Sequence, residues 1–198
     1  MAERVRFHFD PVCPWAWQTA RWVHGLEERG EVDVDWRLFS LQLVNERDDN
    51  PLADRHAAGT RALRALALVR REAGNDGVAR VYRALGTRVH DRDEGMTDEA
   101  VRGALSDAGF DRDVVDRALD DDSTMDDVRA EHELAVADVG CFGVPTIVLP
   151  SGRGMFGPVL STPPHGDDAV ELWRHVRALI ETDGLFELKR ERDRKPGR

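Results

Sequence analysis

The sequence predicts an α/β protein in which a large helical insertion interrupts a mixed sheet. Two alternating strand patterns flank one helix within residues 4–39, which indicates a βαβ unit with a covering crossover helix. A long stretch with helical spacing follows. Strand patterns return only near residue 146 and lead into a last amphipathic helix. The predicted order is therefore βαβ, then helices, then ββα.

The first unit is the most sharply defined. Residues 4–9 alternate between polar side chains and Val5, Phe7 and Phe9, as a half-buried strand does. The helix begins at Pro14, a residue whose fixed φ suits a first helical position, and it ends near Gly30. Residues 32–39 alternate again and form the second strand.

Helical spacing then dominates up to about residue 140. We predict helices over residues 54–73, 76–89, 98–108, 112–119 and 125–139, with Thr97 as an N-cap. The run Asp120–Asp127 is acidic, but it lacks the glycine and the closing glutamate of a calcium loop. A solvated helix junction is therefore favoured over a cation site.

The last unit begins with an apolar strand after Pro145, a turn at residues 151–154 and a return strand at Met155–Phe156. Asp167 begins the final helix, whose apolar side chains recur at helical spacing. We assign residues 1–45 and 140–190 to the core, and residues 46–139 to a helical insertion that acts as a lid. Residues 191–198 form a charged tail that we expect to fray.

Composition narrows the function classes. With 198 residues, 41% hydrophobic and 33% charged, the chain can bury a core of its own. A net charge of −10 argues against nucleic acid as a partner, because phosphate binding needs a basic face. No run approaches the roughly 20 apolar residues of a membrane span, and no apolar signal segment precedes the first strand. We expect a cytoplasmic protein, with a homodimer left open as its assembly.

Cys13 is the candidate reactive residue. It lies between the first strand and Pro14, where the N–H groups of a helix N-terminus stabilise a thiolate. The alternative is a buried, inert cysteine that serves as a small hydrophobic residue. Ala16 stands where a Cys-x-x-Cys motif would have its second thiol. A mixed disulfide on Cys13 would therefore need a second thiol from elsewhere to release it.

Other candidates are weaker. Cys141, the second of only two cysteines, is favoured as a buried packing residue, and the alternative is a resolving or redox partner of Cys13. Trp15 is expected to lie exposed beside the thiol, where an aromatic ligand could stack. The seven histidines lack metal-ligand spacing, so we expect no metal site.

Two distant segments resemble the DsbA-like branch of the thioredoxin superfamily: Phe9-Asp10-Pro11-Val12-Cys13-Pro14-Trp15 and Gly143-Val144-Pro145-Thr146. Further ordered matches at residues 19–22, 43–47, 88–90, 156–161 and 186–190 are similar to the actinobacterial group of mycothiol-dependent nitroreductases. That group carries Cys-Pro-Trp-Cys, from which Ala16 departs. The resemblance implies a thioredoxin-like fold and a cis peptide at Pro145.

The resemblance also implies a function. Cys13 would act as a single nucleophile toward a disulfide or electrophilic substrate, in the class of disulfide or nitro reductases. A low-molecular-weight thiol such as mycothiol or glutathione would resolve the adduct. The residues implied to bind that thiol or the substrate are Pro14, Trp15, Trp22, Asn45, His90, Val144 and Pro145.

Two alternatives stay open at this point. DsbA-like proteins without the second cysteine include 2-hydroxychromene-2-carboxylate isomerases and kappa-class glutathione transferases, which hold a thiol cofactor on the same fold. A non-enzymatic binding module, in which Cys13 is a relic, predicts a thiol with an ordinary pKa and slow alkylation.

Overall fold

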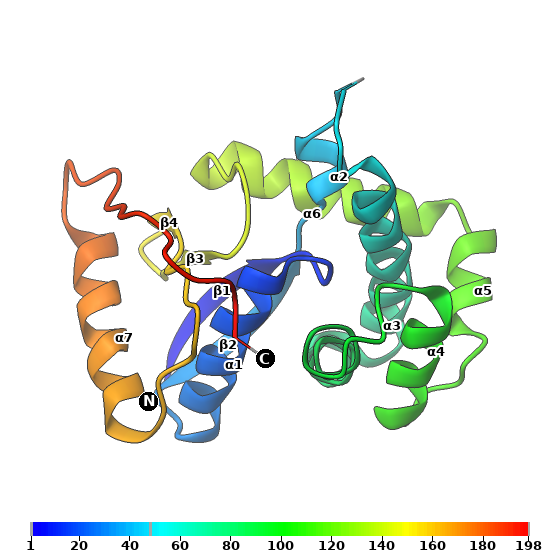
Figure 1. The fold of residues 1–198 in the computed structure, drawn as a ribbon, viewed down its shortest axis with the longest axis horizontal. Helices are drawn as coiled ribbons and strands as arrows, with labels where there is room; N and C mark the ends of the chain where they lie inside the picture. Colours follow the sequence, from blue (N-terminus) through cyan, green and yellow to red (C-terminus); the bar gives the residue numbers. More distant parts are fainter. Residues whose placement is uncertain (1, 48, 198) are drawn as a thin grey trace.

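A computed structural model describes residues 2–47 and 49–197 of the chain (Figure 1). Met1, Asp48 and Arg198, which fall in the predicted core, insertion and tail, lie outside the described residues. The predicted βαβ unit is present as β1 (Glu3–Phe9), α1 (Pro14–Glu28) and β2 (Val32–Leu38). β1 and β2 pair in parallel, with Phe7 opposite Trp36.

The second unit completes a mixed four-stranded sheet. β3 (Thr146–Val148) pairs antiparallel with β1, and β4 (Gly154–Phe156) pairs antiparallel with β3, so the described strands follow the order β2-β1-β3-β4. α7 (Gly166–Glu181) packs beside α1, where the rings of Trp22 and Trp173 lie 6.2 Å apart between centroids. The fold class predicted from the sequence is confirmed.

The helical region lies between β2 and β3. It consists of α2 (Leu41–Val44), α3 (Ala53–Gly86), the π-helical turn η1 (Thr87–Asp91), α4 (Asp98–Asp107), α5 (Val114–Asp120) and α6 (Ser123–Val139). α3 bends at Gly74, where φ is 65°, so the two helices predicted for this stretch are the two halves of α3. Thr97 caps α4 as predicted, since its hydroxyl accepts from Ala100 N at 3.1 Å. The short α2 was not predicted.

The helical region attaches to the sheet along β2, which is an edge strand. Asn75, next to the bend in α3, donates to Val34 O at 2.7 Å and accepts from Trp36 N at 2.8 Å. Glu131 of α6 accepts from Leu38 N at 2.8 Å and pairs with Arg70 at 3.0 Å. These side chains satisfy backbone groups that an edge strand would otherwise leave open.

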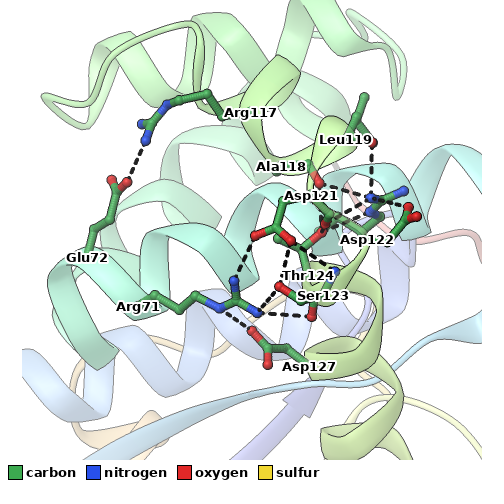
Figure 2. Close-up of polar contacts among 11 residues, drawn as sticks. Arg71, Glu72, Arg117, Ala118, Leu119, Asp121, Asp122, Ser123, Thr124 and Asp127 are labelled. Carbon is green, nitrogen blue, oxygen red and sulfur yellow. Dashed lines mark hydrogen bonds and ion pairs between the residues drawn. The ribbon is translucent and has the colours of Figure 1, made fainter.

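The acidic run is a helix junction held by arginines of α3. Figure 2 shows Arg71 between Asp121 and Asp127, at 3.0 and 2.6 Å, with Ser123 on the same guanidinium. Thr124, buried at the start of α6, donates to Ala118 O at 2.7 Å. The carboxylates therefore have protein cations as partners, which agrees with the favoured interpretation of this run.

The C-terminal segment departs from expectation. The sequence predicts that it frays, whereas in the structure it passes from α7 back to α1 (Figure 1). Arg192 lies 5.0 Å from the ring centroid of Trp15, and Gly197 O accepts from the Gln18 side chain at 2.5 Å. Gly197 N donates to Ser161 O at 2.6 Å. Contacts made through arginine stacking and backbone groups cannot be inferred from the charge composition of the segment.

The division of the chain into core, insertion and tail stays a prediction.

Candidate active site

The two motifs that carry the resemblance meet at Cys13. β1 ends in a turn closed by Cys13 N donating to Asp10 O at 3.0 Å, and this turn makes Cys13 the N-cap of α1. Its Sγ accepts from Ala16 N at 3.4 Å and donates to Val144 O at 3.7 Å. The Val144–Pro145 peptide is cis. A cysteine thiol thus faces a backbone carbonyl brought from the far end of the chain.

The resting thiol is protonated. Burial raises the pKa of Cys13 to about 11; the N–H of Ala16 lowers it, and Asp10 raises it further. The sequence predicts a stabilised thiolate at this helix N-terminus, and that expectation is wrong for the resting fold. The helix does supply an N–H donor, but a side chain only 9% exposed loses more solvation than one long hydrogen bond returns.

A buried carboxyl lies on the same turn. Asp10 is fully buried; its Oδ1 accepts from Val12 N at 3.0 Å and its Oδ2 from Leu41 N at 2.8 Å. Burial raises its pKa to about 7, against the lowering effect of these two N–H groups and of Arg55. Asp10 therefore exchanges its proton near neutral pH, three residues from the thiol.

Two side chains of α3 flank this pair. Arg55 donates to Val12 O at 3.1 Å, and its charge lowers the pKa of Cys13. Tyr82 is fully buried and stacks on Phe9 with 3.8 Å between centroids. Its hydroxyl has no hydrogen-bond partner in the described part of the chain. Burial raises the Tyr82 pKa well above its usual value, and the charges of Cys13 and Asp10 add to that effect, so the Tyr82 hydroxyl stays protonated.

His90 and Asn45 support the turn and do not reach the thiol through any described contact. His90 lies on η1 and its Nε2 donates to Pro11 O at 2.9 Å; burial lowers its pKa, which keeps the ring neutral. Asn45 ends α2 and donates to Leu41 O at 2.8 Å. Leu41 in turn donates to Asp10, so both predicted residues act on the turn that carries Cys13.

The two tryptophans predicted to line the site, Trp15 and Trp22, lie in different places. Trp15, in the first turn of α1, was expected to be exposed but is half-buried, and it lies under Arg192. Trp22 is only 1% exposed, and its Nε1 donates to Ala169 O at 3.0 Å. Trp22 therefore packs between α1 and α7, away from the thiol, because it lies seven residues after Trp15 and so about 10 Å further along the helix axis. Pro14 occupies the first turn of α1 as expected.

Cys141 belongs to the same loop as the cis peptide. Both cysteines are free and buried, and Cys141 donates to Gly143 O at 3.3 Å and to Thr146 Oγ1 at 3.5 Å. These contacts fit a packing residue inside the loop that presents Val144. A role as redox partner of Cys13 stays a prediction.

A third segment closes the site from the side of α1. Gly157 N donates to Pro145 O at 2.8 Å, and the following Gly157–Pro158 peptide is also cis. Pro158 O accepts from Thr19 Oγ1 at 2.7 Å. The segment after β4 therefore ties the cis-proline loop to the first helix, and it explains the match at residues 156–161 as part of the same site.

Sequence reasoning missed Asp10, Arg55, Tyr82 and Arg192 as members of this site. Asp10 had a signal, since it belongs to the segment Phe9–Trp15 that carries the resemblance. Arg55 and Tyr82 lie on a helix of otherwise ordinary spacing, so nothing in the sequence marks them. Among the described residues no group of three or more potential ligands could hold a metal ion.

Comparisons with known proteins agree with this geometry. The model of the Rv2466c-like family, described as mycothiol-dependent nitroreductase Rv2466c, matches residues 12–190. The uncharacterized protein Rv2286c of Mycobacterium tuberculosis (strain ATCC 25618 / H37Rv) is 39% identical over 189 residues, which cover 94% of this chain and 81% of that protein.

Solved structures show the same fold at low identity. A 2-hydroxychromene-2-carboxylate isomerase superposes with a TM-score of 0.63 at 14% identity, over 88% of this chain and 94% of that one. A probable DsbA oxidoreductase from Streptomyces coelicolor gives 0.56 at 21%, over 94% of each chain. The cytosolic disulfide reductase DsbM from Pseudomonas aeruginosa, solved with GSH, gives 0.60 at 13%, over 88% and 99%.

The fold is therefore DsbA-like, with a thioredoxin-type sheet and a large helical region. The family match spans both the Cys13 turn and the cis-proline loop that faces it. This chain belongs to the Rv2466c-like family of mycothiol-dependent nitroreductases.

Proposed function

We propose that the protein is a cytoplasmic thiol oxidoreductase that works through Cys13 alone and is regenerated by a low-molecular-weight thiol. The observation that carries the proposal is the contact of Cys13 Sγ with Val144 O of the cis-proline loop, with Ala16 three residues on. A carbonyl at this position can accept a hydrogen bond from an extended substrate. The missing second thiol leaves release to an external partner.

The exchange has two balanced steps. The Cys13 thiolate attacks one sulfur of a disulfide, so a Cys13–sulfur bond forms while the substrate S–S bond breaks, and the leaving thiolate takes a proton. An external thiol then attacks the mixed disulfide, which returns Cys13 as a thiolate and yields a new disulfide. These two steps use one external thiol and release one substrate thiol. A second external thiol then attacks the new mixed disulfide and releases the other substrate thiol. Two external thiols are therefore oxidised for each disulfide that is fully reduced.

Deprotonation of Cys13 is the demanding event, because its pKa is about 11. Arg55 and the N–H of Ala16 favour the anion, and Tyr82 has a hydroxyl free to donate. Asp10, with a pKa of about 7, opposes the thiolate when it is charged and ceases to do so once it takes up a proton. Proton uptake by Asp10 therefore accompanies thiolate formation in this proposal.

The family match and the glutathione found with DsbM support a small thiol as the partner, with mycothiol as first candidate. Pro14, Trp15, Val144 and Pro145 would line its site. Trp22, Asn45 and His90 would contribute through packing and through the turn.

A second candidate is a thiol-dependent isomerase or transferase. It is favoured by the isomerase superposition and by a Cys13 that is protonated at rest. In that case the external thiol would react while bound and Cys13 would form no covalent adduct.

Mass spectrometry of the protein mixed with oxidised mycothiol or glutathione separates the two. The oxidoreductase predicts one thiol adduct on Cys13 that a reduced thiol removes, in wild type and in Cys141→Ser, but none in Cys13→Ser. If the protein turns over a disulfide or nitro substrate with no adduct at any time, and Cys13→Ser keeps that activity, the oxidoreductase mechanism is wrong.

A further inference from the structure

The C-terminal segment is anchored beside the thiol at three points. Arg192 lies over the ring of Trp15, two residues past Cys13. Gly197 O accepts from Gln18, a side chain only 1% exposed on α1, and Gly197 N donates to Ser161 O. Gly197 sits so close that a Cβ there would lie 2.9 Å from Ser161 O. A segment with this many specific contacts is part of the structure around the site.

The segment itself is positively charged. Residues 189–197 hold five cations and two acids in a chain whose net charge is −10. Arg192 itself has no ion pair with any residue that the structure describes. Its guanidinium is solvent-exposed, so one face covers Trp15 while its N–H groups stay available.

A second cation lies close to the thiol. Arg55 reaches the turn from α3, and its charge acts on Cys13. The acid that faces the thiol most directly is Asp10, which is fully buried and carries only part of its charge near neutral pH. A substrate sulfur at Cys13 would therefore have two cations nearby, Arg55 at Val12 and Arg192 over Trp15.

We propose that Arg192 is a specificity-determining residue that selects substrates with a carboxylate or similar anionic group, placed so that this group meets the free N–H groups of Arg192 beside Trp15 when the reacting sulfur meets Cys13. This inference rests on the proposed function and names its substrate class. Arginine suits the role because its planar fork can stack on an indole and bind a carboxylate in a bidentate manner.

The test compares two aromatic disulfides in a single exchange with Cys13. Dithiobis(nitrobenzoate) carries carboxylates and dithiodipyridine is uncharged. In each case Cys13 forms a mixed disulfide and one aromatic thiolate leaves, which is measured by its absorbance. The measured quantity is the second-order rate constant for dithiobis(nitrobenzoate) divided by that for dithiodipyridine. Peptide mass spectrometry assigns the adduct to Cys13.

We expect Arg192→Gln to lower this ratio by about threefold or more, because a charge a few ångströms from the carboxylate is removed. Arg192→Lys should keep most of the ratio, and Arg174→Gln, the same charge change on the exposed face of α7, should leave it unchanged. Salt at about 0.5 M should bring the wild-type ratio close to that of Arg192→Gln. Gly197→Ala should lower the ratio without altering net charge, because its Cβ displaces the segment.

A ratio that is the same in wild type, Arg192→Gln and Arg174→Gln would overturn the inference and leave the proposed function standing. If Arg174→Gln lowers it as much as Arg192→Gln does, the effect is one of net charge and the assignment to Arg192 is wrong. If Cys13 reacts with neither disulfide, the proposed function itself fails.

Discussion

At the scale of single residues, Cys13 and Asp10 form one electrostatic unit. The turn between β1 and α1 buries both, and each ionised group raises the cost of ionising the other. The backbone hydrogen bonds that the two groups receive differ. Asp10 accepts from the N–H groups of Val12 and Leu41, whereas the Cys13 thiol accepts from Ala16 N at 3.4 Å. The carboxyl is therefore the group that titrates near neutral pH, and the thiol follows at higher pH.

The first prediction concerns the thiol. Asp10→Asn removes a negative charge from beside Cys13, so the apparent pKa of Cys13 should fall by about half a unit to one unit. The rate of iodoacetamide alkylation between pH 7 and 11 measures this pKa. Asp33→Asn, an exposed position on β2, is the matched control and should not move the profile. An unchanged profile in Asp10→Asn would show that the Asp10 charge does not reach the sulfur.

The second prediction concerns stability against pH. Asp10 has a folded pKa of about 7 against an ordinary value of 3.8, so the folded state holds the proton more tightly than the unfolded chain. Its contribution to the free energy of unfolding therefore falls as pH rises from about 4 to about 7, by about 4 kcal/mol in the limit.

Urea unfolding of wild type and Asp10→Asn at pH 5 and pH 8 isolates this effect. Subtracting the two proteins cancels other titrating groups such as His8, whose pKa burial lowers to about 3 and whose contribution runs in the opposite direction. The variant should gain stability relative to wild type between the two pH values. A difference that stays constant with pH would contradict a raised Asp10 pKa.

At the scale of elements, α3 controls how the turn is held. The helix crosses so close that a Cβ on Gly59 would lie 2.7 Å from Asp10 Oδ1 and 3.0 Å from Val12 Cγ1. The same helix supplies Arg55 on one side of this point and Tyr82 further along. The bend at Gly74 divides α3 into two halves. The half that contains Gly59 packs against the turn, and the half that contains Tyr82 packs against Phe9 of β1.

The third prediction follows from that contact. Gly59→Ala should destabilise the protein by about 1–3 kcal/mol and change the alkylation rate of Cys13, because the buried carboxyl and Val12 must shift. Gly25→Ala is the control: it lies in α1 with nothing within 4 Å of its Cβ position. That change should instead stabilise by about 0.5–1 kcal/mol through helix propensity. Equal effects of both substitutions on unfolding would mean that α3 does not press on the turn.

Prediction from sequence succeeded where the signal is local. Alternation defined β1 and β2, helical spacing defined α4 and α7, and Thr97 marked a cap. The meeting of Cys13 with Val144 came from the resemblance, since no local pattern links residues 131 positions apart. α2 was missed because four apolar-rich residues suit a helix or a strand end equally well.

The site's electrostatics could not be predicted for a different reason. The pKa of Cys13 depends on how much of α3 and of the cis-proline loop covers it, and desolvation by tertiary packing outweighs the helix N-terminus that the sequence does reveal. The docked tail was missed because its charges suggest solvation, whereas its contacts are one stacked guanidinium and one glycine.

At the scale of the whole molecule, the helical region and the sheet are joined along β2. An edge strand exposes N–H and C=O groups, and here α3 and α6 meet them with Asn75 and Glu131. Gly74 makes this possible, because its left-handed φ of 65° interrupts α3 where Asn75 must turn toward the strand. The same docking fixes α3 relative to β1, and so fixes Arg55, Gly59 and Tyr82 around the thiol.

The fourth prediction is that Asn75 stabilises the molecule as a unit. Asn75→Ala removes both hydrogen bonds to β2 and leaves the N–H of Trp36 and the carbonyl of Val34 without partners at buried positions, which should cost about 1–3 kcal/mol. The exposed neighbour Asp76→Ala should change the free energy of unfolding by less than about 0.5 kcal/mol. Hydrogen exchange should show the loss of protection in β2 and in both halves of α3, because the sheet edge and the helix share these bonds. Exchange that increases only around residue 75, with β2 unchanged, would mean that the helical region is anchored elsewhere.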